Sequence, residues 1–411
     1  MSTLFDIGQS TTWEPLQVEL WSHTGQRLGY VGKYDSMTFT YADRGADTAI
    51  LVLPLDSLSA QLVPCDGTVL VGMRYNGTAH ITTPVKAEVE AGDTPDQAMV
   101  KITTAGGWTL LDGQRVPPSL GSPLLEQTSE KWEIKGNLET VIKTLITVGV
   151  QRTGHPVYVL PDQKRGPEVE ATGSWDTVAQ AVDTLLVKNG YRLDLSGWLP
   201  GDQQPDGAAL RTPYVIADVV PYTAHDGLVW TVESGDIVDW SVTHTRATTT
   251  RGTVGYEIKD QAQRRYLSIR GEESASPWSV RDSFVEYTDH KEIDDRQPDP
   301  YVVARGMEAE GDDRLAKGAP SFGLSVKVDV GNTWQFKRGS LEPRTFDLGH
   351  YADIYLPVLG HYRQVITEVE LHVTPNSFSV TPTVSTPDTL DTDMFSAVAT
   401  LAQRLDKMER T

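Results

Sequence analysis

Hydrophobic and polar residues alternate with a period of two along most of the chain, which is the pattern of strands that bury one face. An alternating run at 69–75 is followed by Asn76-Gly77, and the alternation resumes at Ala79 and Ile81. Asn-Gly between two such runs predicts a hairpin, because both residues tolerate positive φ. Similar short runs occur at 16–20, 85–89, 99–102, 214–220, 228–232, 238–242, 322–330, 365–373 and 378–384. We therefore predict a mainly β protein with a few helices, of the β+α class.

Three helices are predicted before the C-terminal segment. The spacing of their apolar residues and the capping residues at their N-termini indicate them. Asn137, Ser174 and Pro300 begin segments that continue to about residues 150, 189 and 315. Asparagine and serine cap helix N-termini with their side chains, and proline fits the first helical turn. Asn189-Gly190 ends the second segment as a left-handed pair.

A fourth helix is predicted at the end of the printed sequence, where Asp388 serves as its cap. Its apolar residues are spaced alternately by four and three, as in a heptad repeat. These residues are Met394, Val398, Leu401, Leu405 and Met408. Two heptads are too short to hold a coiled coil alone. Two interpretations stay open: the helix docks on its own domain, or it associates with copies of itself through these five oligomerisation residues.

Length and composition narrow the class of protein. A chain of 411 residues predicts two to four domains, and turn-rich or charged stretches at 117–123, 198–213, 291–300 and 381–387 are candidate linkers. The net charge is −20, from 56 acidic and 36 basic residues. Such a chain is poorly suited to hold nucleic acid or anionic lipid through a basic surface, but it suits a channel that DNA passes without binding.

The cellular context follows from what the sequence lacks. The single cysteine, Cys65, excludes a disulfide framework and a cysteine-rich zinc site. The apolar runs are shorter than a membrane span, and the first ten residues have no basic region typical of a signal peptide. We expect a soluble protein that is made in the cytoplasm.

No sequence motif indicates catalysis. The chain lacks G-x-S-x-G, H-E-x-x-H, a Walker loop, G-x-G-x-x-G and an EF-hand loop. Cys65 is predicted to be a small buried apolar residue. His350 and His361 lie on either side of a predicted hairpin, where surface or interface histidines are favoured over a metal site. We predict no catalytic residue, no metal site and no cofactor.

The aromatic residues raise the alternative of carbohydrate binding, because sugar rings stack on flat aromatic side chains. Trp21, Trp230 and Trp240 lie in alternating runs, where packing in the core is expected. Trp108 and Trp278 lie beside a glycine and a proline, so they are better candidates for an exposed binding surface.

The two ends of the chain resemble a known family. The opening has the segments Q-V-E-L-W at 17–21, M-T-F-T-Y at 37–41 and A-I-L-V-L-P at 49–54. The close has F-D-L-G-H-Y-A-D-I at 346–354, followed by the strand at 362–373. These segments are similar to those of the minor tail proteins of actinobacterial siphophages, the ReqiPepy6-like tail family. The sequence departs from the family pattern at 350–352, where three residues separate Gly349 from Asp353.

The resemblance implies the architecture of a phage tail-tip or baseplate hub. It has two tube-like β domains, two peripheral domains and a terminal helix, and it carries no catalytic residues. The expected domains are 1–115 (a tube-like domain completed by strands near 215–245), 116–212 and 213–320 (peripheral), 321–385 (the second tube-like domain) and 386–411 (the heptad helix).

The resemblance also implies a function, a location and partners. We expect a structural virion protein, a homotrimeric ring at the tail tip that surrounds the path of the DNA and the tape-measure protein. Its partners would be the distal tail protein, the tape-measure protein and receptor-binding or tail-fibre proteins, with transient DNA passage. The alternative is a tail protein that binds or hydrolyses the host cell wall, for which Trp108 and Trp278 are the candidate contacts. A secreted host β-sandwich is disfavoured by the lone cysteine.

Overall fold

The computed structural model describes residues 16–92, 97–127, 129–258, 263–270, 278–287, 300–328 and 334–385. The chain divides into two compact units, Met1–Trp240 with Ser325–Thr411 (unit 1) and Ser241–Leu324 (unit 2). Strands β14 (Ile237–Thr245) and β18 (Ser321–Val328) cross the boundary, so the chain leaves unit 1 along the first and returns along the second. The finer division into five domains stays a prediction.

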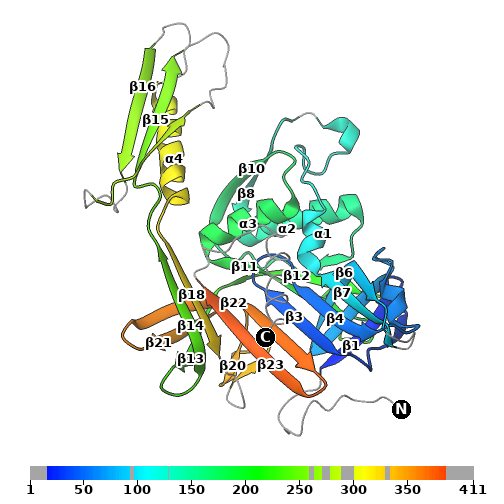
Figure 1. Ribbon diagram of the computed structural model, residues 1–411. Helices are drawn as coiled ribbons and strands as arrows, with labels where there is room; N and C mark the ends of the chain where they lie inside the picture. Colours follow the sequence, from blue (N-terminus) through cyan, green and yellow to red (C-terminus); the bar gives the residue numbers. More distant parts are fainter. Residues whose placement is uncertain are drawn as a thin grey trace. The chain divides into compact units, whose positions relative to one another are not determined.

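Unit 1 is built on a large mixed sheet, which Figure 1 shows in blue, green and orange. Its central order is β13-β21-β22-β3-β4-β7-β6-β11-β12-β9; β5, β1 and β2 branch from β6, and β23 pairs with β22. The prediction of a mainly β protein is confirmed. The strands are β1 (Gln17–Ser22), β2 (Arg27–Tyr30), β3 (Ser36–Ala42), β4 (Thr48–Pro54), β5 (Val69–Tyr75), β6 (Thr78–Glu90), β7 (Met99–Ala105), β9 (Val157–Val159), β11 (Tyr191–Trp198), β12 (Tyr214–Pro221), β13 (Thr223–Thr231), β21 (His350–Leu356), β22 (Gly360–Thr374) and β23 (Ser377–Ser385).

The predicted Asn-Gly hairpin joins β5 to β6. Asn76 and Gly77 have φ of 46° and 79°, and Tyr75 pairs with Thr78 across the turn. The opening strand, β1, lies inside the sheet, because it pairs with β2 on one side and β5 on the other. The edge strand is β2, a short segment that is too polar to show the alternating pattern.

Two helices cover one face of the sheet where β11 and β12 lie (Figure 1). They are α2 (Leu138–Thr153) and α3 (Val178–Asn189). Asn137 occupies the predicted N-cap of α2, and Gly190 ends α3 with φ of 68°. The cap of α3 is Thr177 and not Ser174, because the Thr177 hydroxyl accepts from the backbone N–H of Gln180 while the Gln180 side chain binds back to the cap. This reciprocal capping box satisfies two N–H groups that the helix leaves free.

Unit 1 also contains several short elements. They are the 3-10 helices η1 (Ser59–Leu62) and η3 (Leu124–Glu126), helix α1 (Gly107–Asp112) and the paired strands β8 (Trp132–Asn137) and β10 (Glu168–Gly173). Apolar side chains of α2 and α3, such as Ile142 and Val182, pack with Leu193 and Ala217 of the sheet into one core. The predicted linker at 117–123 begins with buried prolines, so Pro117 and Pro118 are packed against the unit.

The C-terminal part of unit 1 contains the two-residue strands β19 (Gln335–Phe336) and β20 (Thr345–Phe346), followed by β21, β22 and β23. The segment at 381–387 was expected to be an extended spacer. Residues 381–385 instead form the end of β23, where Ser385 lies opposite Val365. Pro382 is tolerated there because β23 pairs with β22 alone.

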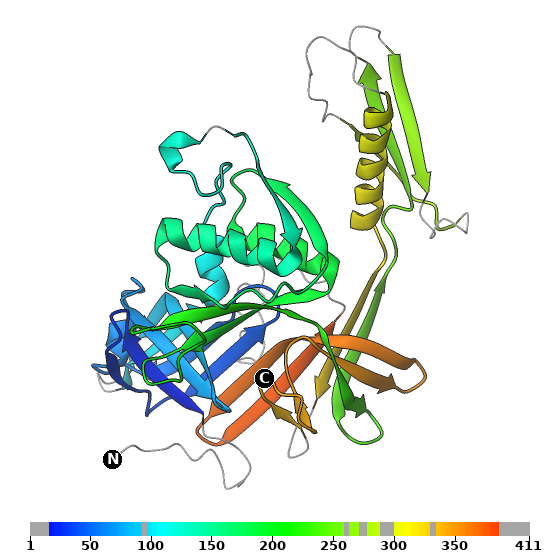
Figure 2. The ribbon, with the colours of Figure 1, turned by 180° about the vertical axis from the view of Figure 1, so that it is seen from behind.

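Unit 2 has a three-stranded sheet with a helix on one face. Strand β15 (Arg251–Ile258) lies between β16 (Gln263–Arg270) and β17 (Asp282–Glu286), and α4 (Pro300–Lys317) packs against them, as Figure 2 shows from behind. The core contains Val254, Tyr256 and Met307, flanked by other apolar residues. The prediction that Pro300 begins a helix is confirmed.

Candidate functional site

A cluster of buried charges joins three distant parts of unit 1. Asp43 follows β3, Arg192 and Asp194 lie in β11, and Arg338 and Asp347 come from the segment around β20. Arg192 Nη1 lies 2.9 Å from Asp194 Oδ1, and Arg338 Nε lies 3.1 Å from Asp347 Oδ1. Arg338 also pairs with Asp194, and Arg192 Nη2 lies 3.6 Å from Asp347 Oδ2. The cluster therefore ties the first strands to the C-terminal ones.

The electrostatics of this cluster suit structure rather than proton transfer. Burial raises the pKa of Asp43 to about 6 despite the charge of Arg192, and Tyr222 donates a 2.7 Å hydrogen bond to its Oδ2. Burial would also raise the pKa of Asp194, but Arg338 and Arg192 hold it well below its usual range. Charges matched this closely fix the segments relative to one another.

A second network of charges lies under α2. Glu139 is fully buried, and its Oε1 lies 2.6 Å from Lys143 Nζ and 2.9 Å from Arg165 Nη2. Asp218 of β12 accepts from both cations, at 2.8 Å from Lys143 Nζ and 2.6 Å from Arg165 Nη2. Although burial opposes it, the hydrogen bonds from Arg165 and Lys143 lower the pKa of Glu139 to about 2. This network attaches α2 to the sheet beneath it.

One of the two histidines of the C-terminal hairpin differs from the sequence prediction. His350 is buried, and its ring centroid lies 5.2 Å from that of His225. Its Nδ1 accepts a hydrogen bond from the Asp347 N–H, and burial lowers its pKa to about 4, so the ring is neutral. His361 is exposed as predicted, and its Nε2 lies 2.8 Å from Asp353 Oδ1.

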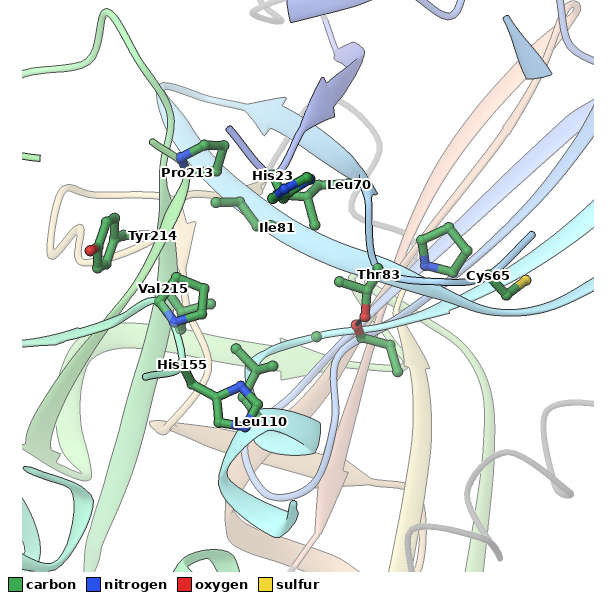
Figure 3. Close-up of a pocket in the computed structure, with 16 residues that line it drawn as sticks. His23, Cys65, Leu70, Ile81, Thr83, Leu110, His155, Pro213, Tyr214 and Val215 are labelled. Carbon is green, nitrogen blue, oxygen red and sulfur yellow. Dashed lines mark hydrogen bonds between the residues drawn. The ribbon is translucent and has the colours of Figure 1, made fainter. Parts of the chain in front are cut away.

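Figure 3 shows a pocket of about 410 Å³ in unit 1, where β5, β6, α1 and β12 meet. His23, Cys65 and His155 reach it from different sides. Burial raises the pKa of the Cys65 thiol, which disfavours a reactive thiolate. Cys65 is half-buried in a turn with φ of 50°, so its prediction as a core residue is wrong.

Across the described ranges, no three or more His, Cys, Asp or Glu residues are grouped so that they could hold a metal ion.

The tryptophans test the carbohydrate alternative. Trp21 and Trp230 are buried as predicted, and Trp278 is 88% exposed. Two predictions are wrong. Trp108 is buried because α1 turns it into the core beside α3, and Trp240 is 36% exposed because most of β14 is uncovered.

Unit 2 adds an aromatic surface that the sequence analysis missed. Tyr266 of β16 and Phe284 of β17 are 60% and 54% exposed, with ring centroids 6.4 Å apart. Both rings lean over Gly255 of the central strand, where an added Cβ would lie 2.8 Å from Phe284 Cζ and 3.4 Å from Tyr266 Cε1. The sequence signal of this surface is Gly255 in the central strand, because a glycine there leaves room for the aromatic side chains of the two neighbouring strands.

The unpaired sheet edges of unit 1 are the features that could join copies of the chain. Among the described strands, β2, β9, β13 and β23 each have one neighbour in the large sheet. The first two are four and three residues long, and β13 is interrupted by a bulge between Ala224 and Val229. Strand β23 is nine residues long and carries no charged residue. Proteins usually protect such edges with charges or prolines, and β23 has one proline, Pro382, but no charge, so it is the best candidate among these edges for pairing with another strand.

The predicted oligomerisation residues, Met394, Val398, Leu401, Leu405 and Met408, lie outside the described residues. In the part of the chain that is described, no helix has the length and hydropathy needed to cross a membrane.

Comparison with solved structures identifies the fold. A 43 kDa tail protein of prophage MuSo2 from Shewanella oneidensis matches with a TM-score of 0.51 at 11% identity, over 91% of this chain and all of that one. A tail protein from Neisseria meningitidis MC58 has a TM-score of 0.49 at 12% identity, over 90% of this chain and 96% of that one. The first match shows a shared fold.

A search of curated proteins found no match. The model of the family described as Siphovirus ReqiPepy6 Gp37-like protein matches residues 17–384, which include both ends that carried the resemblance. The chain therefore belongs to the Siphovirus ReqiPepy6 Gp37-like family of phage tail proteins.

Proposed function

We propose that this chain is the hub of a siphophage tail tip, a ring of three copies that encloses the path of the DNA and the tape-measure protein. The ring joins the distal tail protein to receptor-binding or tail-fibre proteins. The observation that carries the proposal is the long uncharged edge of β23, together with membership of a tail protein family. Pairing of this edge with a neighbouring copy satisfies its backbone groups and favours a closed assembly.

The charge of the chain is compatible with a conduit for DNA. Each phosphate that a protein neutralises adds affinity, so a strongly basic lumen would retain DNA. A net charge of −20 instead favours passage without binding. The heptad residues from Met394 to Met408 would bundle the three chains below the ring.

The decisive measurement is the mass of the purified protein by light scattering, followed by imaging of the particles. We expect a trimer with a central hole. A protein that is a monomer both in isolation and in the tail would contradict the proposal.

Two variants locate the contact between copies. Ser379→Lys with Thr381→Lys places charges on β23 and should shift the trimer toward monomer, because charged residues disfavour strand pairing at an edge. Asn376→Lys is the matched control, since Asn376 lies in the exposed turn before the same strand. Leu401→Asp with Leu405→Asp tests the heptads separately and should lower the association state or detach a partner at the C-terminus. Unchanged mass in both double variants would count against the two contacts.

The alternative is a tail protein that binds or hydrolyses the host cell wall. Trp278 and the exposed pair Tyr266 and Phe284 of unit 2 favour it, because open aromatic surfaces stack on sugars. Binding of the protein to isolated host envelope, lost on Phe284→Ser, would support this alternative. Release of soluble glycan fragments would show hydrolysis.

A further inference from the structure

The pocket of Figure 3 is lined largely by apolar side chains. Leu70 and Ile81 come from β5 and β6, Leu110 from α1, and Val215 from β12. Its volume of about 410 Å³ lies within the range of pockets that bind ligands. Binding of apolar side chains in such a pocket is favourable, because it removes apolar surface from water.

We propose that a segment of the same chain, Leu4-Phe5-Asp6-Ile7, occupies this pocket. These residues precede the described part of unit 1, and three of the four are large and apolar. In an extended segment alternate side chains point the same way. Phe5 and Ile7 therefore enter the pocket together, while Leu4 and Asp6 face away from it. The proposal is independent of whether the chain forms a ring.

The length of the segment before Leu16 supports this choice. Trp21 of β1 pairs with Leu70, which lines the pocket, so the pocket lies five residues along β1 from Leu16. Five residues of strand span roughly 17 Å. A chain extends at most about 3.6 Å per residue, so Trp13, three residues before Leu16, reaches only about 11 Å. Ile7, nine residues before Leu16, reaches about 32 Å and can fold back to the pocket of its own chain.

The single cysteine provides a probe inside the pocket. In Phe5→Cys, oxidation should join the new thiol to Cys65, because docking brings the two residues within the distance of a disulfide. We expect a linked species with the mass of one chain and no free thiol. Trp13→Cys is the matched control, since its reach is too short, and it should form the link at least tenfold more slowly. Phe5→Cys with Leu110→Glu should fall to the rate of this control, with the fold checked by circular dichroism.

A second measurement leaves the pocket residues unchanged. Docking shields Cys65, so Phe5→Asp with Ile7→Asp should raise the rate at which a maleimide labels Cys65 by about tenfold. Trp13→Asp should leave that rate unchanged. Equal linking in Phe5→Cys and Trp13→Cys, or equal labelling in the variant and the wild type, would overturn the proposal. A disulfide that joins two chains would also overturn it, because the segment would then occupy the pocket of another copy.

Discussion

The two units differ in how their sheets are covered. In unit 1, α2 and α3 cover the face of β11 and β12, and buried charges tie together strands that are distant in sequence. In unit 2, α4 covers one face of the sheet, while Tyr266 and Phe284 remain more than half exposed on the strands beside Gly255. Exposed aromatic clusters of this kind often mark surfaces of contact. Unit 1 is therefore fixed by internal packing and buried charges, whereas unit 2 leaves an aromatic surface of its sheet exposed.

The hydrophobic cores of the two units also differ, and unit 1 again has the more extensive packing. The helical layer of unit 1 buries a large set of apolar residues from α1, α2, α3 and the sheet. Among the residues of unit 2 that the structure describes, the apolar cluster has three buried members, Val254, Tyr256 and Met307. Because stability rises with buried apolar area, we expect unit 2 to unfold first.

The largest loss in the free energy of unfolding is expected from Arg192→Met in the charge cluster of unit 1. The substitution removes the guanidinium that lies beside Asp43, Asp194 and Asp347, while Arg338 still pairs with Asp194 and Asp347. Removing one partner of buried charges typically costs about 3–5 kcal/mol in the free energy of unfolding. Urea denaturation measures the loss. Lys86→Met is the control, because Lys86 and Glu88 form an exposed pair that contributes less than about 1 kcal/mol. Equal losses in the two variants would show that the buried charges of unit 1 contribute no more to its stability than an exposed pair.

A smaller effect, confined to unit 2, is expected from Met307→Ala. Truncation of a buried methionine costs about 2–5 kcal/mol, because it removes apolar contact and leaves a cavity. Hydrogen exchange should accelerate in β15 and remain unchanged in β11. Faster exchange in both strands would show that the units unfold together and would break the comparison.

The pH dependence of unit 1 gives a third test, at His350. Its folded pKa of about 4 lies below the ordinary value of 6.5, so the neutral ring stabilises the fold above pH 6.5. As pH falls from 6.5 toward 4, the unfolded chain gains a proton that the folded chain resists, and stability is lost. The difference corresponds to at most about 3 kcal/mol.

His350→Gln should remove that loss, which denaturation at pH 7.5 and pH 4.5 measures. Asp43 changes the stability with the opposite dependence on pH, over a similar pH range. Its raised pKa of about 6 means that stability is lost as pH rises from about 4 to 6. Asp43→Asn is therefore the control and should change the pH slope with the opposite sign. A wild-type slope that neither variant alters would contradict the assignment.

The sequence predicted most elements whose cause is local. The Asn76-Gly77 turn and the end of α3 at Gly190 are determined by residues that accept positive φ. The buried charge cluster could not be predicted, because Asp43, Arg192 and Arg338 are far apart in sequence and are brought together only by the tertiary fold. Trp108 was misassigned for the same reason, since a neighbouring glycine gives no information about what a short helix packs against. The pocket likewise gathers residues from β5, α1 and β12 that no motif connects.

The smallest effect is expected at the cap of α3, where two neighbouring residues compete as candidates. The Thr177 hydroxyl accepts from Gln180 N at 3.0 Å, whereas the Ser174 hydroxyl donates to the Glu130 carbonyl at 2.8 Å. Loss of an N-cap side chain typically costs about 1 kcal/mol, because one helix N–H loses its partner. Thr177→Ala should therefore lower the stability of unit 1 by about 1 kcal/mol in urea denaturation, and Ser174→Ala by less. Since the cap belongs to unit 1, exchange in β15 of unit 2 should stay unchanged. A loss in Thr177→Ala no larger than that in Ser174→Ala would contradict the assignment of Thr177 as the cap.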